Sequence, residues 1–242
     1  MPSDQKKNEM KKILQLAAFA AALLLTGSCL KDPGYIVLNE QTTGDLIEGR
    51  FLSDQGLWYD IAEQTCEGRL ADCERAIIIC DILRESTKNE PAYDIRLKKF
   101  VSVGLPEVVK TTEGEQEDPV LVDLSWVSGR YLNLRVIYHT VAKSTANHSF
   151  KVALVKKPSG TEPLVVRVLH DADGEYLGAD NIKEEDLQQA VAFISIPIVE
   201  YYEDLKDYTI YYEVEYLWHK TGDDGNLLPE TENDTLNGKL YS

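Results

Sequence analysis

Three histidines occupy positions at which imidazole nitrogens could bind a zinc ion. His139, His170 and His219 each lie at or near the end of a segment expected to be a β-strand. If those strand ends meet at one rim of a sheet, two or three neutral imidazoles converge there. Because the register of the strands is unknown, three unrelated surface histidines are the more common arrangement, and we assign neither a metal site nor a cofactor.

Cysteines suggest a second kind of chemistry, the formation of a disulfide. Cys66 and Cys73 flank six residues that connect two expected strands. Strand ends at the mouth of a hairpin lie about 5 Å apart, within reach of a disulfide. Cys80 lies on the apolar face of residues 74–83, while Asp81 marks the outer face. We therefore predict a Cys66–Cys73 disulfide and a free, buried Cys80.

Acidic residues at 171–175 (Asp-Ala-Asp-Gly-Glu) resemble part of a calcium loop. The full loop needs further acidic ligands and two flanking helices, so a tight turn between strands is favoured. The sequence contains no nucleophile elbow, no zinc-protease pair of histidines and no phosphate-binding glycine loop. Acidic pairs are abundant, but nothing singles one out for hydrolysis. We expect no enzymatic activity.

Aromatic residues leave a glycan-binding alternative open, because flat rings stack on sugars. The candidates are Trp58, Trp126 and Trp218, with tyrosines near residues 201–202 and 211–212. In the alternating segment 208–218, Trp218 falls on the inward face, where core packing is the more common role.

The N-terminal segment has the three parts of a secretory signal: a basic head, an apolar run at 13–25 and small residues up to Ser28. The run is shorter than the about 20 residues that span a bilayer. A cysteine directly after Leu-Thr-Gly-Ser resembles the lipobox of bacterial lipoproteins, which implies removal of residues 1–28 and lipidation of Cys29. The alternative is a plain secretory signal in which Cys29 is incidental.

Charge limits the partners of the mature chain. Removing residues 1–28 takes away four lysines and two acids, which leaves 21 basic and 39 acidic residues and a net charge of −18. Nucleic acid and anionic lipid surfaces repel such a chain. We therefore expect no nucleic-acid partner, membrane attachment only through the lipid anchor, and an envelope protein or a glycan as partner.

Residue patterns predict an all-β protein. The first half contains four or five strands, among them 45–51, 57–61, 74–83 and 93–98. Six alternating or apolar segments of the second half predict a two-sheet β-sandwich: 120–126, 131–139, 150–154, 164–168, 190–199 and 208–218. In 131–139, Asn133, Arg135 and His139 are expected to face water. Only residues 183–189 look helical.

Composition divides the chain into units. A tether at 29–34 precedes a small β-domain at 35–110. Residues 111–119, acidic and free of apolar side chains, are the expected linker. The sandwich follows at 120–219, and the polar segment 220–242 is expected to be a mobile tail.

Three stretches carry a resemblance to a known family. They are residues 126–134 (Trp-Val-Ser-Gly-Arg-Tyr-Leu-Asn-Leu), Glu162-Pro163 and residues 167–174 (Arg-Val-Leu-His-Asp-Ala-Asp-Gly). Together they resemble the carboxy-terminal domain of NigD-like lipoproteins, and the first half looks like the OB-type barrel of the same family. The resemblance covers about residues 35–219, although the Cys66/Cys73 pair and the 183–189 insertion depart from the family pattern.

What the resemblance implies is an outer-membrane, lipid-anchored protein with an OB-like barrel followed by a β-sandwich. The family takes its name from a gene of a bacteriocin cluster, so an immunity or accessory role is implied by association only. The main hypothesis is a non-enzymatic binding or assembly component of the cell envelope. The rival is a glycan-binding or glycan-hydrolysing surface lipoprotein.

Overall fold

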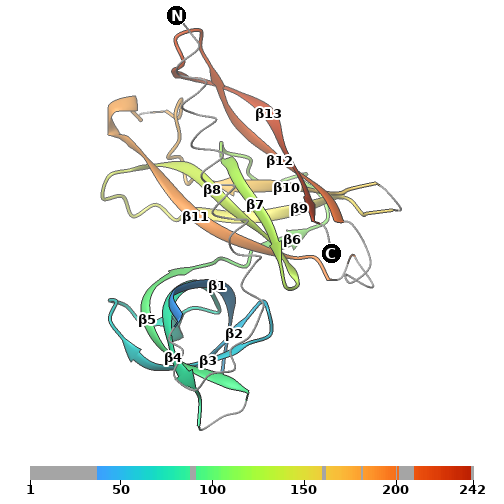
Figure 1. Cartoon of the computed structure of the whole chain (residues 1–242). Coiled ribbons are helices and arrows are strands. Elements are labelled where there is room, and N and C mark those ends of the chain that lie inside the picture. Colours follow the sequence, from blue (N-terminus) through green and yellow to red (C-terminus); the bar gives the residue numbers. More distant parts are fainter. Residues whose placement is uncertain are drawn as a thin grey trace, which may run out of the picture.

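A computed structural model describes residues 37–87, 91–159, 162–180, 182–199, 201 and 210–240. The predicted signal peptide, Cys29 and the tether lie outside these residues. The predicted all-β class is confirmed, with a barrel and a pair of packed sheets (Figure 1). Within the described residues, no helix has the length and apolar character needed to cross a membrane.

The first half folds into a closed barrel with strand order β1-β2-β3-β5-β4. Its strands are β1 (Val37–Ile47), β2 (Arg50–Ser53), β3 (Trp58–Gln64), β4 (Arg75–Glu85) and β5 (Ala92–Ser102), with a short 3-10 helix at Leu70–Asp72. β3 and β5 pair in parallel, whereas the other neighbours are antiparallel. This is the arrangement of an OB-type barrel. Inward side chains fill it, among them Phe51, Tyr59, Ile78, Cys80 and Leu97.

A tight hairpin interrupts the single strand expected at residues 45–51. Glu48 and Gly49 both have positive φ angles, 53° and 79°, and they connect β1 to β2. Two consecutive positive φ angles match the right-handed twist of a two-residue hairpin. The glutamate at the first position concealed this turn, because asparagine, aspartate or glycine is usual there. The predicted turn at residues 53–56 is confirmed by the 2.8 Å hydrogen bond from Gly56 N to Ser53 O.

The second half packs two sheets face to face, as Figure 1 shows. One has the order β13-β12-β10-β9-β6 and the other β11-β8-β7. Their strands are β6 (Glu107–Val109), β7 (Leu121–Ser128), β8 (Tyr131–Val141), β9 (Ser149–Lys156), β10 (Leu164–Asp171), β11 (Leu187–Pro197), β12 (Ile210–Thr221) and β13 (Leu227–Leu240). The buried residues of both sheets form one apolar core that includes Leu134, Val166, Ile196 and Val214.

The boundary between the halves comes earlier than the predicted residue 110. β6 pairs in parallel with β9 of the sandwich, and Gly104 forms a bridge with Ile194. The predicted linker 111–119 contains no strand, but it packs against the sandwich, since Asp118 is buried and accepts a hydrogen bond from Ala172 N at 2.8 Å. Two further acids of this segment form ion pairs with the sandwich, Glu115 with Lys151 and Glu117 with Arg167.

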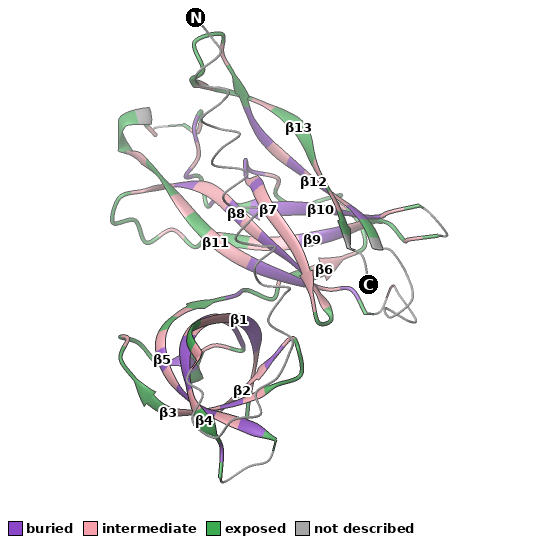
Figure 2. Cartoon of the chain, viewed as in Figure 1, coloured by how far each residue is buried: buried purple, intermediate pink, exposed green. Residues whose placement is uncertain are grey.

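The predicted mobile tail at 220–242 is wrong for residues 227–240. They form β13, which pairs with β12 over almost its whole length (Figure 1). Figure 2 shows β13 as mostly exposed, because it is the last strand of its sheet. An exposed edge strand needs few apolar residues, so its composition resembled that of a tail. The predicted helix at 183–189 is also wrong, since only Glu184–Asp186 forms a 3-10 turn and β11 begins at Leu187.

Candidate functional site

Arg75, the first residue of β4, is 0% exposed and lies between the barrel and the sandwich. Its two Nη atoms donate to barrel carboxylates, Asp45 Oδ1 and Asp54 Oδ2, each at 2.7 Å. Its Nε donates to Ser195 Oγ of β11 at 2.9 Å, and Nη2 also lies 3.3 Å from Asn133 Oδ1 of β8. One guanidinium therefore bonds to both halves of the protein.

Neighbouring polar groups close a ring around this guanidinium. Ser128 Oγ donates to Asp54, and Asn133 Nδ2 donates to Ser128 Oγ at 2.9 Å. The ring of Tyr131 covers the guanidinium, with its centroid 3.8 Å from Arg75 Cζ. Burial alone would lower the pKa of Arg75, but the hydrogen bonds and charges of Asp54 and Asp45 raise it. The arginine therefore stays charged, and its charge is balanced inside the junction.

The sequence motif at 126–134 supplies the sandwich side of this junction. Gly129 has φ +54°, and a Cβ there would lie 3.1 Å from Asp54 Cβ, so the hairpin tip fits closely against the barrel. Asn133, which was expected to face water, is buried. The alternation along β8 was correct, but at Asn133 the outer face of this sheet meets Arg75 of the barrel instead of water. The motif is therefore structural, because it holds the two halves together.

The four histidines form two pairs and no common rim, and all but the half-buried His148 are buried. The ring centroids of His139 and His219 are 5.3 Å apart, and those of His148 and His170 are 5.4 Å apart. Of the three histidines singled out in the sequence, two therefore meet, while His170 joins the loop histidine His148. His139 was expected to face water, but it is buried and stacks on Trp218 of β12.

The His148–His170 pair belongs to a hydrogen-bonded chain. His170 Nδ1 donates to the carbonyl of Pro119 at 3.1 Å, and His170 Nε2 lies 3.2 Å from His148 Nδ1. His148 Nε2 lies 3.4 Å from Glu175 Oε2. Since Nδ1 of His170 carries the donated proton, Nε2 of a neutral His170 accepts the hydrogen bond from His148 Nδ1. Burial lowers the pKa of His170 to about 4, against the opposing effect of the Pro119 carbonyl.

Glu175 ties two loops to the end of the sandwich. It accepts hydrogen bonds from Thr140 Oγ1 and Val141 N, both at 2.8 Å, and from Ser144 Oγ. Burial alone would raise its pKa, but these hydrogen bonds, with that of His148, lower it to about 2. The predicted turn at 171–175 is confirmed by the hydrogen bond from Glu175 N to Ala172 O at 3.0 Å. Glu175 therefore fixes these loops by hydrogen bonding, and its carboxylate oxygens already accept from protein donors.

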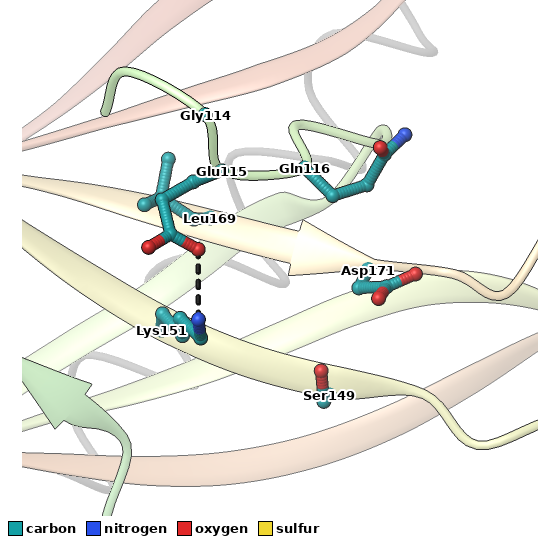
Figure 3. Close-up of a pocket in the computed structure, with 7 residues that line it drawn as sticks. All are labelled: Gly114, Glu115, Gln116, Ser149, Lys151, Leu169 and Asp171. Carbon is teal, nitrogen blue, oxygen red and sulfur yellow. Dashed lines mark hydrogen bonds and ion pairs between the residues drawn. The ribbon is translucent and has the colours of Figure 1, made fainter.

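A polar hollow of about 230 Å³ lies between the segment 114–116 and the outer face of β9 and β10 (Figure 3). Its lining consists of Gly114, Glu115, Gln116, Ser149, Lys151, Leu169 and Asp171. Lys151 Nζ donates to Glu115 Oε2 at 2.8 Å, and this hydrogen bond raises the lysine pKa. The ammonium therefore stays protonated, so this lysine is a poor general base. The charged lining of the hollow therefore suits the binding of a small polar molecule better than it suits catalysis.

The three described cysteines are free thiols in this structure. Cys66 and Cys73 are half-buried and pack against the barrel core, one on each side of the 3-10 helix. The predicted Cys66–Cys73 bridge stays a prediction, to be checked by mass spectrometry after non-reducing digestion. Cys80 is buried in the barrel, as expected, and burial raises its thiol pKa to about 12.

The three tryptophans differ in their surroundings. Trp218 is buried and stacks on His139, which agrees with a packing role. Trp126 is half-buried and contacts Phe193 edge to face. Trp58 of β3 is also half-buried, and the guanidinium of Arg50 lies 4.7 Å from its ring centroid.

No family model and no curated protein matches the chain. Solved structures do match. A protein of unknown function, DUF1344, from Bacteroides vulgatus ATCC 8482 is 13% identical and aligns over 86% of this chain and 92% of its own, with a TM-score of 0.56. A putative toxin related protein from Parabacteroides distasonis ATCC 8503 is 15% identical and aligns over 84% of this chain and 93% of its own, with a TM-score of 0.51.

The matched structures include a NigD-like immunity protein from Bacteroides caccae ATCC 43185. It is 16% identical over 81% of this chain and 92% of its own, with a TM-score of 0.48. At such identities the likeness is one of fold, and it rests on the two structures with the higher TM-scores. The fold of this chain, a barrel followed by packed sheets, is therefore one that these two solved structures share.

Sequence reasoning missed Arg75 and Glu175, each of which forms hydrogen bonds with several other residues. Arg75 opens an apolar strand, where a charged residue usually marks the exposed end. Its bond to Ser195 joins positions 120 residues apart, which no local pattern reveals. Glu175 was recognised only as part of a turn. The available signals were their positions: Glu175 directly follows the family-like stretch 167–174, and Arg75 lies in the alternating segment 74–83.

Proposed function

We propose that this protein is a lipid-anchored, non-enzymatic component of the cell envelope that acts by binding a partner or as part of an assembly. The observation that carries the proposal is the Arg75 junction, in which one buried side chain bonds to the barrel and to the sandwich. Joined in this way, the two halves present their loops in a fixed relation. Such preorganisation favours binding, because less conformational entropy is lost when a partner docks.

The anchor is inferred from the sequence around Cys29. Acyl chains on this cysteine would hold the mature protein at the membrane, and more than one chain is needed for stable attachment. The net charge of −18 after removal of residues 1–28 opposes binding to anionic lipid. Lipidation is therefore the attachment that fits this chain, with the outer membrane as the expected site. A bacteriocin-associated role is a finer form of the proposal, and it depends on the NigD-like resemblance.

A glycan-binding role is the second candidate, and Trp58 favours it. This ring lies on β3, beside Arg50 of β2, and Arg50 Nε bonds to Asp60 Oδ1 at 2.7 Å. In OB-type barrels, the face of strands 2 and 3 is a common binding surface for oligosaccharides. A half-exposed aromatic ring with adjacent donors and acceptors is the usual lining of a sugar site.

Two parallel assays separate these candidates. The tag-free mature protein is cross-linked in detergent-solubilised envelopes and its partners are identified, while the same preparation is applied to envelope glycans. The proposal expects a reproducible protein partner whose capture survives Trp58→Ala and no change in any glycan. Binding to a glycan that is lost in Trp58→Ala would favour the second candidate. Conversion of a glycan would contradict the non-enzymatic proposal.

A further inference from the structure

The pair of His139 and His219 joins the last residues of β8 to the end of β12, since the two ring centroids are 5.3 Å apart. His139 is 7% exposed and His219 is 2% exposed. His139 stacks on Trp218, with the ring centroids 5.5 Å apart, and His219 meets the same tryptophan edge to face. Strand pairing fixes the β12–β13 hairpin here, since His219 is opposite Thr231 of β13. Both imidazoles are therefore held by packing against a rigid neighbour.

The ring nitrogens of this pair are not satisfied by the protein. Nδ1 of His139 and both nitrogens of His219 are buried and have no hydrogen-bond partner among the described residues. The backbone of Leu228 and Pro229 lies near enough to favour a protonated His219, but it does not reach hydrogen-bonding geometry. Buried polar atoms normally have partners, and an orphan in a native site calls for an unseen water, ion or ligand.

An open cavity of about 220 Å³ adjoins the pair. Its lining consists of His139, Leu177, Leu187, Gln189, Asn226 and Leu227. Three leucines and two side-chain amides thus surround one imidazole, with the second imidazole next to it. A recess of this kind, mostly apolar with a few polar groups, is the usual form of a small-ligand site.

We propose that His139 and His219, together with this cavity, bind a divalent transition-metal ion of the zinc class. With Zn–N bonds of about 2.0–2.1 Å and tetrahedral angles, the centres of two ligating imidazoles lie about 5 Å apart. The observed separation is 5.3 Å. Borderline metal ions prefer neutral imidazole nitrogens, and a cation would occupy lone pairs that nothing in the protein uses.

Burial supports the neutral state of both ligands. It lowers the pKa of His139, and burial together with the adjacent His139 lowers the pKa of His219. At neutral pH the rings therefore have lone pairs available for a metal. The negative charge of the chain, −16 over its full length, also favours the approach of a cation.

The site would be an open one. The described residues contain no cluster of three His, Cys, Asp or Glu that could hold a metal ion. The two imidazoles would supply two ligands, and amide oxygens of Gln189 or Asn226, or water, would complete the coordination. Structural zinc sites are closed by four protein ligands, so this site would differ from them in keeping positions for water or another donor.

Zinc titration of the tag-free protein tests the proposal. Cys66→Ser and Cys73→Ser are included to remove half-buried thiols as competing ligands. Calorimetry measures the stoichiometry, and long-range proton–nitrogen spectra of the imidazoles report which rings bind. We expect saturation at one zinc per chain and shifted ring nitrogens in two of the four histidines, which His139→Phe and His219→Phe assign to this pair.

Each variant has a matched control in the other pair. Since loss of an outer-shell partner typically costs 10–100-fold in affinity, His139→Phe should weaken zinc binding by at least about 100-fold. His148→Phe, which alters the other pair, should leave the affinity unchanged. If a variant does not fold, the imidazole spectra of the protein with all four histidines still show which rings bind zinc. Shifts at His148 and His170 instead, shifts at no histidine, or binding without saturation would overturn the proposal.

Discussion

Replacing Arg75 by methionine should destabilise the protein strongly, because it leaves two carboxylates without their cation. Met fills a similar volume, but the Asp54 side chain, 4% exposed, keeps its burial and Asp45 loses its 2.7 Å contact with Nη1. Breaking a buried ion pair by removing one partner costs about 3–5 kcal/mol. The free energy of unfolding, measured by urea denaturation, should fall by about that amount, and the barrel and sandwich should unfold in separate transitions.

Arg84 provides the control on the same strand. Its Nε bonds to Asp94 at the same 2.7 Å, but its side chain is 68% exposed. Exposed pairs contribute about 0.2–1 kcal/mol, so Arg84→Met should be nearly neutral. Combining Arg75→Met with Asp54→Asn should recover part of the loss, because one uncompensated charge is removed. A loss below about 1 kcal/mol for Arg75→Met, or equal losses at both arginines, would refute the role of the junction.

Three further predictions concern acid stability, packing and thiol reactivity. His170 and Glu175 both have folded-state pKa values below their ordinary ones, about 4 and about 2. Because the unfolded chain then binds more protons, the stability is complete above about pH 6.5 and falls as the pH drops towards 2. A free energy of unfolding, measured in urea, that stays flat from pH 7 to 3 would contradict this. Gly44→Ala should lose about 1–3 kcal/mol in thermal or urea unfolding, because its Cβ would lie 2.2 Å from the backbone oxygen of Leu52. An unchanged free energy of unfolding would contradict this close approach. Cys80 should resist alkylation in the native protein and react only after unfolding, as peptide mass mapping with iodoacetamide can establish.

Strand periodicity predicted much of the fold. Alternation in 131–139 and 208–218 identified the buried rows of β8 and β12, because one face of each strand packs into the sandwich core. The same rule failed on the outer face of β8, where Asn133 meets the barrel instead of water. A period of two tells which residues share a face, but it does not tell what covers that face.

Elements without an apolar repeat were harder to predict. β13 is an exposed edge strand that gains its order from pairing with β12, so its composition does not distinguish it from a tail. The β1–β2 turn has a glutamate at a position with positive φ, which few glutamates adopt.

The polar sites could be predicted only in part, because their members come from distant strands. Histidines at strand ends were recognised, but whether His139 meets His170 or His219 depends on register and sheet order. The bond between Arg75 and Ser195 likewise requires the placement of the barrel against the sandwich. A local sequence pattern contains neither the order of the strands in a sheet nor the placement of the barrel against the sandwich.

Lipidation at Cys29 is the central part of the proposed function, and intact mass spectrometry tests it most directly. The full-length chain is produced in a bacterium that processes lipoproteins, and the protein is recovered from membrane and soluble fractions. We predict a membrane-bound chain that begins at Cys29 with added acyl mass, and a soluble Cys29→Ala variant with intact folded domains. An unmodified wild-type chain found in the soluble fraction to the same extent as Cys29→Ala would contradict the proposal.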